Sequence, residues 1–66
     1  MKLTVNGNEQ EYGAAAALGA FLREQGADPE RTAVVVNDRV VRRQEHAAFR
    51  LKEGDRVEIL QFVGGG

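Results

Sequence analysis

AAAALGAFLREQ, residues 14–25, decides the fold, because no other segment of the chain has the spacing of an amphipathic helix. Its apolar side chains recur at intervals of three and four residues: Ala14, Leu18, Phe21 and Leu22. Gln25 lies on the same stripe of the helix. Gly26 follows and can take the left-handed conformation that ends many helices. Gly19 lies within the helix, where we expect the backbone to approach a sheet closely.

Strand-like segments stand on both sides of this helix. Leu3 and Val5 alternate with polar residues, and residues 32–36 are mostly β-branched. The predicted strands cover residues 2–5, 9–12, 32–36, 40–41 and 56–62, of which 9–12 is polar enough to form an edge. Turn signals separate them: Asn6-Gly7-Asn8, Asn37-Asp38 and Glu53-Gly54-Asp55. We expect a short helical turn at Asp28-Pro29 and an irregular connection over residues 44–50.

These elements predict an α+β domain in which one helix packs across one face of a four- to five-stranded sheet, because only a sheet offers the apolar surface that the helix must cover. The domain should span residues 1–62, followed by a flexible glycine tail at residues 63–66. The predicted core consists of apolar residues that face between helix and sheet: Leu3, Val5, Leu18, Phe21, Leu22, Val34, Val36, Leu51, Val57 and Ile59.

Composition excludes several classes of function. The chain has 66 residues, a formal net charge of −1 and no cysteine. Its basic residues are interspersed with acidic ones, which argues against nucleic-acid binding. Without cysteine there is no disulfide, thiolate nucleophile or sulfur-ligated metal. No apolar run approaches the ~20 residues of a membrane span, so we expect a cytoplasmic protein that does not enter a membrane.

The polar side chains do not form a recognisable catalytic or metal-binding group. His46 is the only histidine and has no evident partner, so a surface or local structural role is expected. Three aspartates occur in predicted turns, where their oxygens can accept hydrogen bonds from nearby amides: Asp28, Asp38 and Asp55. Arg42 and Arg43 are interpreted as solvated charges.

The chain ends in Phe62-Val63-Gly64-Gly65-Gly66, a run of glycines directly after an apolar segment. Glycine has no side chain to pack and loses the most entropy when it is ordered, so the run adds nothing to a stable fold. It is either a frayed terminus or a segment that another protein uses.

Five segments together resemble the sulfur-carrier proteins of the ubiquitin-like, β-grasp superfamily, and most closely the ThiS family of thiamine thiazole biosynthesis. They are Lys2-Leu3-Thr4-Val5-Asn6-Gly7, Asp28-Pro29-Glu30-Arg31, Val36-Asn37, Gly54-Asp55-Arg56-Val57-Glu58-Ile59 and Phe62-Val63-Gly64-Gly65-Gly66. Family members typically end in two glycines, and an ending with one more glycine before them, as in this chain, resembles the ThiS branch. Asp38 departs from the pattern, because relatives often have glycine after the middle asparagine.

The resemblance implies a β-grasp fold with a mixed sheet and a carrier that is not itself an enzyme. Gly66 would be adenylated by a ThiF-like adenylyltransferase that uses ATP and Mg²⁺, and then converted to a thiocarboxylate. A sulfur donor such as a cysteine desulfurase would supply the sulfur, and a ThiG-like thiazole synthase would receive it. The chain would bind no cofactor or metal of its own and would be a monomer when free.

The tail also needs a surface that orients it toward a partner. Gly64 and Gly65 would thread into a narrow channel, since they carry no side chains. If Val57 and Ile59 face the helix, Leu60 and Phe62 point to the open face of the sheet. The family resemblance adds Val35 beside them, and the partner-binding surface is then predicted at Val35, Leu60, Phe62 and Val63. In the alternative interpretation, Leu60 and Phe62 cap the core.

Other functions stay open at this point. The small subunit of molybdopterin synthase and carriers for transfer-RNA thiolation share the fold and the terminal glycine pair. A ubiquitin-like binding module whose tail is never activated would work only through its exposed sheet face.

Overall fold

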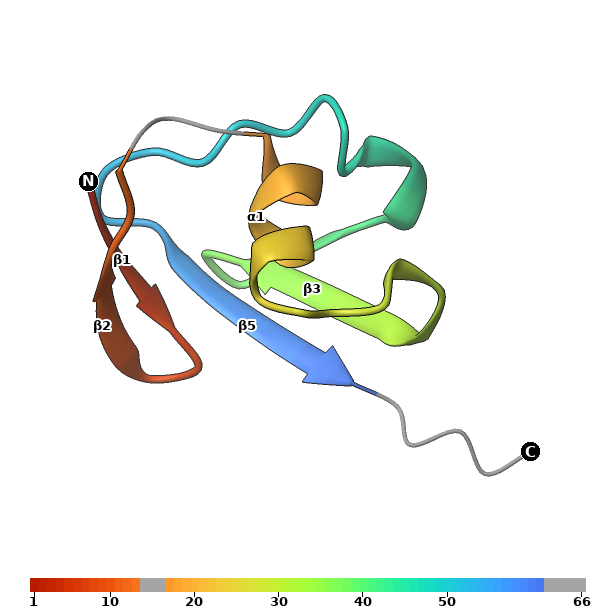
Figure 1. The fold of residues 1–66 in the computed structure, drawn as a ribbon, viewed down its shortest axis with the longest axis horizontal. Coiled ribbons are helices and arrows are strands. Elements are labelled where there is room, and N and C mark those ends of the chain that lie inside the picture. Colours follow the sequence, from red (N-terminus) through yellow and green to blue (C-terminus); the bar gives the residue numbers. More distant parts are fainter. Residues whose placement is uncertain (14–16, 62–66) are drawn as a thin grey trace.

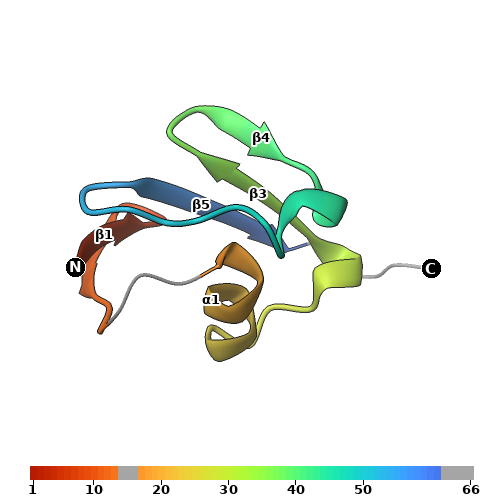
Figure 2. The ribbon, with the colours of Figure 1, turned by 90° about the horizontal axis from the view of Figure 1, so that it is seen from above.

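The computed structural model describes residues 1–13 and 17–61 of the chain. Its five strands form one sheet in the order β2-β1-β5-β3-β4. Helix α1 lies across one face of this sheet (Figures 1 and 2). The strands are β1 (Lys2–Val5), β2 (Asn8–Glu11), β3 (Thr32–Val36), β4 (Arg39–Val41) and β5 (Arg56–Gln61). The helices are α1 (Leu18–Glu24) and the short 3₁₀ turns η1 (Pro29–Arg31) and η2 (Arg43–Glu45). The predicted α+β architecture is confirmed.

The last strand occupies the centre of the sheet. β5 runs parallel to β1, with Val5 opposite Val57, and antiparallel to β3, with Val34 opposite Ile59. The two hairpins, β1-β2 and β3-β4, flank this central strand on either side. The sheet is therefore mixed, as expected for a β-grasp fold, and the polar strand β2 lies at an edge, as predicted.

Helix α1 is shorter than predicted. Residues 14–16 lie outside the described part of the chain, and Ala17 is extended, with ψ of 146°. Ala17 instead forms an antiparallel bridge with Arg50, so a tertiary contact overrides the helical preference of alanine. At the other end Gly26 takes φ of +77°, and the amide of Ala27 donates to the carbonyl of Leu22, as in a Schellman cap. The predicted cap at Gly26 is confirmed.

Residues 43–50 pack against the start of α1. The backbone amides of Leu18 and Gly19 donate to the carbonyls of Phe49 (2.7 Å) and His46 (3.0 Å). These two contacts satisfy amides that no side chain caps. The expectation that Gly19 approaches the sheet is wrong, because a Cβ there would face the backbone of His46 at 3.7 Å. Residues 44–50 were expected to be irregular, but η2 opens this segment as a short 3₁₀ turn.

The core lies between α1 and the sheet. Every predicted core residue except Ile59 is buried, and Val41 joins them. Ile59 is partly buried, because it lies beyond the last residue of β1 and lacks a full neighbouring strand on that side. No helix in residues 1–13 and 17–61 is long and apolar enough to cross a membrane.

Candidate functional site

Part of the predicted site lies outside the described residues. Gly64, Gly65 and Gly66, with the predicted partner contacts Phe62 and Val63, belong to the undescribed segment 62–66. The structure does describe β5 up to Gln61 and the sheet face from which the predicted docking surface is built.

An apolar patch covers part of the open face, the side of the sheet opposite α1. Ala33 stands opposite Leu60 in the β3-β5 pair, and Val35 stands opposite Val40 in the β3-β4 pair. Residues directly opposite in a pair point to the same face, and both β3 residues alternate with the buried Val34. We call Ala33, Val35, Val40 and Leu60 the open-face patch.

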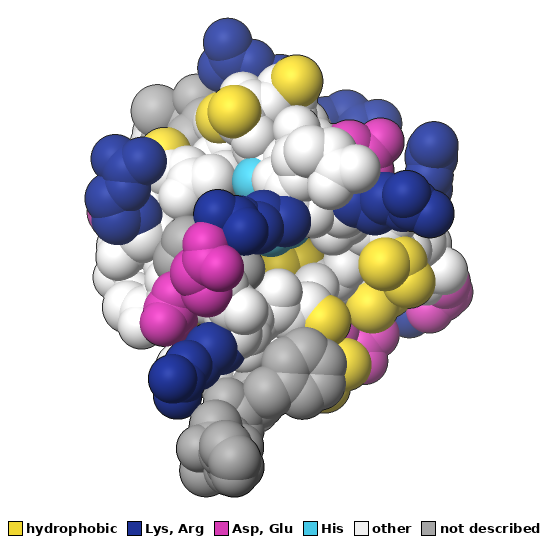
Figure 3. Space-filling model, turned by 90° about the vertical axis from the view of Figure 1, so that its right-hand side faces the viewer, with side chains coloured by type: hydrophobic (Ala, Val, Ile, Leu, Met, Phe, Trp, Pro, Cys, Tyr) yellow, Lys and Arg dark blue, Asp and Glu magenta, His cyan; other side chains and the backbone are white. Residues whose placement is uncertain are grey.

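The patch is exposed to solvent at its two largest members. Leu60 is 54% exposed and Val40 is 67% exposed. The alternative in which Leu60 caps the core is therefore wrong. Charged residues border the patch within the sheet: Glu58 stands opposite Val35, and Arg56 stands opposite Thr4. On the side of the molecule where β5 ends, Figure 3 shows hydrophobic side chains among Lys, Arg, Asp and Glu side chains.

Sequence reasoning missed Val40. The signal was present in the turn: Asn37 and Asp38 both have positive φ, at 51° and 67°, as in the two-residue turn of a tight hairpin. Such a turn sets the register, so that Val36 pairs with Arg39 and Val35 pairs with Val40. Val40 therefore had to face the same side as Val35.

Asn6 holds the second half of β5 in place. β1 ends at Val5, but the side chain of Asn6 continues the pairing along β5. Its Oδ1 accepts from the amide of Ile59 at 2.7 Å, and its Nδ2 donates to the carbonyl of the same residue at 3.4 Å. The backbone amide of Asn6 also donates to the carbonyl of Val57 at 2.9 Å.

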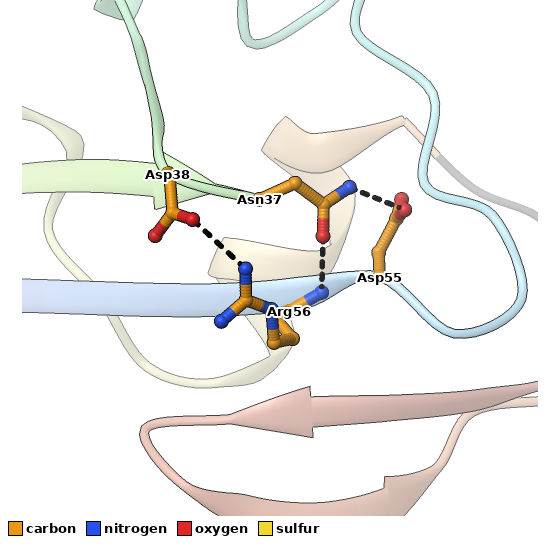
Figure 4. A network of polar contacts seen from close by, with 4 residues as sticks. All are labelled: Asn37, Asp38, Asp55 and Arg56. Atoms are coloured by element: carbon orange, nitrogen blue, oxygen red, sulfur yellow. Dashed lines mark hydrogen bonds and ion pairs between the residues drawn. The ribbon is translucent and has the colours of Figure 1, made fainter.

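A second asparagine holds the start of β5 from the other side (Figure 4). Asn37 Oδ1 accepts from the amide of Arg56, and its Nδ2 donates to Asp55, both at 2.9 Å. The buried Asp55 carboxylate also accepts from the amide of Lys52 at 2.7 Å, which confirms its predicted role in the turn. The strand that leads toward the glycine segment is thus fixed on both sides.

The other polar residues have structural contacts that partly match the predictions. Asp28 accepts from the amide of Glu30 at 2.9 Å, as expected for a turn aspartate. Asp38 does not bond to a nearby amide in the described structure, because its carboxylate pairs with the Arg56 guanidinium at 2.9 Å. Arg42 is exposed, as predicted, and Arg43 is exposed but forms an ion pair with Glu30.

His46 has a local structural role and is not a surface residue. It is only 6% exposed, and its Nε2 lies 3.3 Å from the carbonyl oxygen of Val41. The histidine became buried because the segment around η2 folds over the start of α1, which its isolated position in the sequence did not indicate. The described residues contain no group of three or more His, Cys, Asp or Glu side chains that could hold a metal ion.

The surroundings of Tyr12 shift the pKa of its hydroxyl group. Its hydroxyl donates to a Glu24 carboxylate oxygen at 2.6 Å, and its ring packs edge-on against Phe21. The hydrogen bond to Glu24, with smaller effects of desolvation and the Glu24 charge, raises the pKa of Tyr12 above its ordinary value. This pair ties β2 to α1 and lies away from the open-face patch.

The chain has clear relatives. The ThiS family profile matches residues 3–66. The thiazole synthases of Paramagnetospirillum magneticum and Magnetococcus marinus are each 38% identical to this chain over 66 residues, which is 100% of this chain and 20% of each relative. The chain therefore spans about one fifth of the length of these curated relatives.

Solved structures agree with this assignment. The crystal structure of the thiamine biosynthesis protein ThiS from Geobacter metallireducens is similar, with a TM-score of 0.86, 38% identity and coverage of 100% of both chains. An NMR solution structure of a thiamine biosynthesis protein from the same organism gives a TM-score of 0.82 and covers 100% of this chain and 88% of that one. The profile, the identity and the shared β-grasp architecture lead to one conclusion: the chain belongs to the ThiS family.

Proposed function

We propose that this chain is a sulfur carrier whose Gly66 carboxylate is adenylated and then converted to a thiocarboxylate, which donates sulfur for the thiazole ring of thiamine. A ThiF-like enzyme with ATP and Mg²⁺ would activate the carboxylate, and a sulfur donor such as a cysteine desulfurase would supply sulfur. A ThiG-like thiazole synthase would accept it. In this proposal the chain is a substrate of its partners and performs no catalysis.

Membership of the ThiS family is the observation that carries this proposal. The chemistry also suits a glycine terminus. A terminal carboxyl has a pKa of about 3.5, so at neutral pH it is an anion and a poor electrophile. Its oxygen would attack the α-phosphorus of ATP and release pyrophosphate. Sulfide would then attack the acyl carbon, and AMP would leave with the electrons of the broken C–O bond. A persulfide from a desulfurase would instead give an acyl disulfide, and a thiol would have to reduce its S–S bond to release the thiocarboxylate.

The glycines would provide reach and a small cross-section. Six residues from Gln61 to Gly66 span roughly 20 Å at most when extended. Glycine lets such a segment enter a channel too narrow for side chains. Asn6 and Asn37 support the proposal, because they fix the strand from which this segment continues.

Intact-protein mass spectrometry tests the carrier chemistry. The protein is incubated with ATP, Mg²⁺, the adenylating partner and a sulfur donor, and its mass should rise by the exchange of one oxygen for one sulfur. Gly65→Ala, or deletion of Gly66, should abolish this change, because an added Cβ or a shortened segment misplaces the carboxylate. An unchanged yield of thiocarboxylate from Gly65→Ala would contradict the proposal.

The open-face patch is the proposed docking surface for the activating partner. Burial of one such side chain is worth about 1.5–3 kcal/mol, enough in sum for a transient complex. Leu60→Asp should therefore slow adenylation without unfolding the domain. Gln44→Asp is a matched control, since it adds the same charge at an exposed position of η2. Equal adenylation rates for wild type and Leu60→Asp would refute the docking role.

Two alternatives make different predictions. A carrier for molybdopterin synthesis or transfer-RNA thiolation would form the same thiocarboxylate but would not rescue a thiamine auxotroph. The thiazole synthase relatives favour the thiamine branch over these carriers. A ubiquitin-like binding module would bind partners through its open face and show no change in mass.

A further inference from the structure

A cleft on the helix side of the sheet has no role in the proposed function. Its volume is about 390 Å³, within the range of sites that hold a ligand or a large side chain. It lies where α1 meets the segment that begins at η2, away from the open-face patch. Its walls are mostly apolar and come from Ala17, Ala20, Leu22, Ala27 and Ala47.

The charged residues that line the cleft in the described structure are both basic. Arg23 and Arg43 both line it, and both are exposed to solvent. No Asp or Glu is among the described residues that line it. Arg43 is partly neutralised by Glu30, whereas no ion pair to Arg23 occurs in the described part of the chain. The cleft therefore joins an apolar floor to an uncompensated positive charge.

His46 adds a polar group to the wall. A carbonyl oxygen can only accept a hydrogen bond, so Nε2 donates to the Val41 carbonyl at 3.3 Å. His46 is among the residues that line the cleft, and within the described residues no hydrogen bond joins its Nδ1.

We infer that this cleft binds a short segment of a protein partner that carries an apolar side chain flanked by carboxylates. The apolar side chain fills the space between the alanines, and a carboxylate pairs with Arg23. A small molecule fits less well, because small-molecule sites bury most of the ligand's surface, whereas both arginines of this cleft are exposed to solvent. Helix α1, whose residues line the cleft, covers the face of the sheet opposite the open-face patch (Figure 2). Two partners can therefore bind at the same time, one in the cleft and one on the patch.

Titration of the ¹⁵N-labelled full chain with two blocked peptides, Glu-Leu-Leu-Glu and Lys-Leu-Leu-Lys, tests the inference. The acidic peptide should produce saturable shifts at the amides of Ala20 and Ala47, and the basic peptide should bind at least about fivefold more weakly, since two exposed charge interactions change sign. Arg23→Glu should reverse this preference. Lys52→Glu is a matched control at an exposed turn outside the cleft and should leave both affinities unchanged.

A second variant keeps the test decisive if Arg23→Glu perturbs the fold. Ala47→Asp places a carboxylate at an exposed position on the other wall and should also weaken the acidic peptide. Equal affinity for the two peptides, shifts confined to the open-face patch, or no saturable shift at all would overturn the inference. No step of this test involves Gly66, so its outcome is independent of the proposed sulfur chemistry.

Discussion

Replacement of Asn6 should loosen the strand that leads to the glycine segment. In Asn6→Ala, the amide of Ile59 loses its 2.7 Å hydrogen bond, which is worth about 1 kcal/mol, and the 3.4 Å contact to its carbonyl adds little. Asn6 also has φ of +49°, a conformation that costs alanine about 1 kcal/mol more. The free energy of unfolding should fall by about 2 kcal/mol, which corresponds to a decrease in Tm of roughly 10 °C for a domain of this size.

Two measurements check this reasoning. Urea unfolding followed by far-UV circular dichroism gives the loss of stability. Hydrogen exchange gives its location, because the amide of Ile59 should lose more protection than that of Phe21 in α1. Asn6→Gly is the matched control, since glycine accepts the positive φ and removes only the side-chain bonds, so its loss should be about 1 kcal/mol.

A small and uniform effect would refute the argument. If Asn6→Ala destabilises the protein by less than about 0.5 kcal/mol, the side chain does not continue the pairing of β1 along β5. The same conclusion follows if Ile59 keeps its protection in both variants.

Two further predictions concern other polar contacts. Tyr12 is the only tyrosine, so tyrosinate absorbance should report a pKa above the ordinary value of about 10, and Glu24→Gln should lower it. The folded state favours the neutral phenol, so the stability that the Tyr12–Glu24 contact adds is complete below pH 10 and is lost as pH rises through the higher folded pKa. If Glu24→Gln left the pKa of Tyr12 unchanged, the hydrogen bond to Glu24 would not be its cause. Asp55→Ala leaves the Lys52 amide and the Asn37 side-chain N–H without their acceptor, so the free energy of unfolding measured with urea should fall by about 3 kcal/mol. A decrease of less than about 1 kcal/mol would show that water replaces the carboxylate.

The fold was predictable because local signals agreed with one another. A single amphipathic helix, alternating strands and three tight turns left one arrangement in which the helix covers a sheet. The first residue of the helix was not predictable. Alanines favour a helix, and only the bridge between Ala17 and Arg50 makes α1 begin at Leu18. Such a contact joins residues far apart in the sequence and leaves no local signal.

The candidate site was predictable where strand alternation applied. Leu60 followed from the face assignment of Val57, and its exposure agrees with that assignment. Val35 followed from the family resemblance, which places β3 beside β5, together with its alternation against Val34. A local structural role for His46 was among the expectations, but its burial was not predictable, because it depends on how residues 43–50 fold over α1 and not on its neighbours in the sequence.

The parallel alignment of β1 and β5 has a mechanical consequence. A force that pulls the end of β5 away from the start of β1 runs along both strands, so it loads their hydrogen bonds in shear. The bonds from Thr4 to Asp55, from Asn6 to Val57 and from Ile59 to Asn6 then share the load and must rupture together. A partner that pulls on the end of β5 would therefore meet high mechanical resistance. β4, a short strand at the sheet edge, would separate from β3 one hydrogen bond at a time.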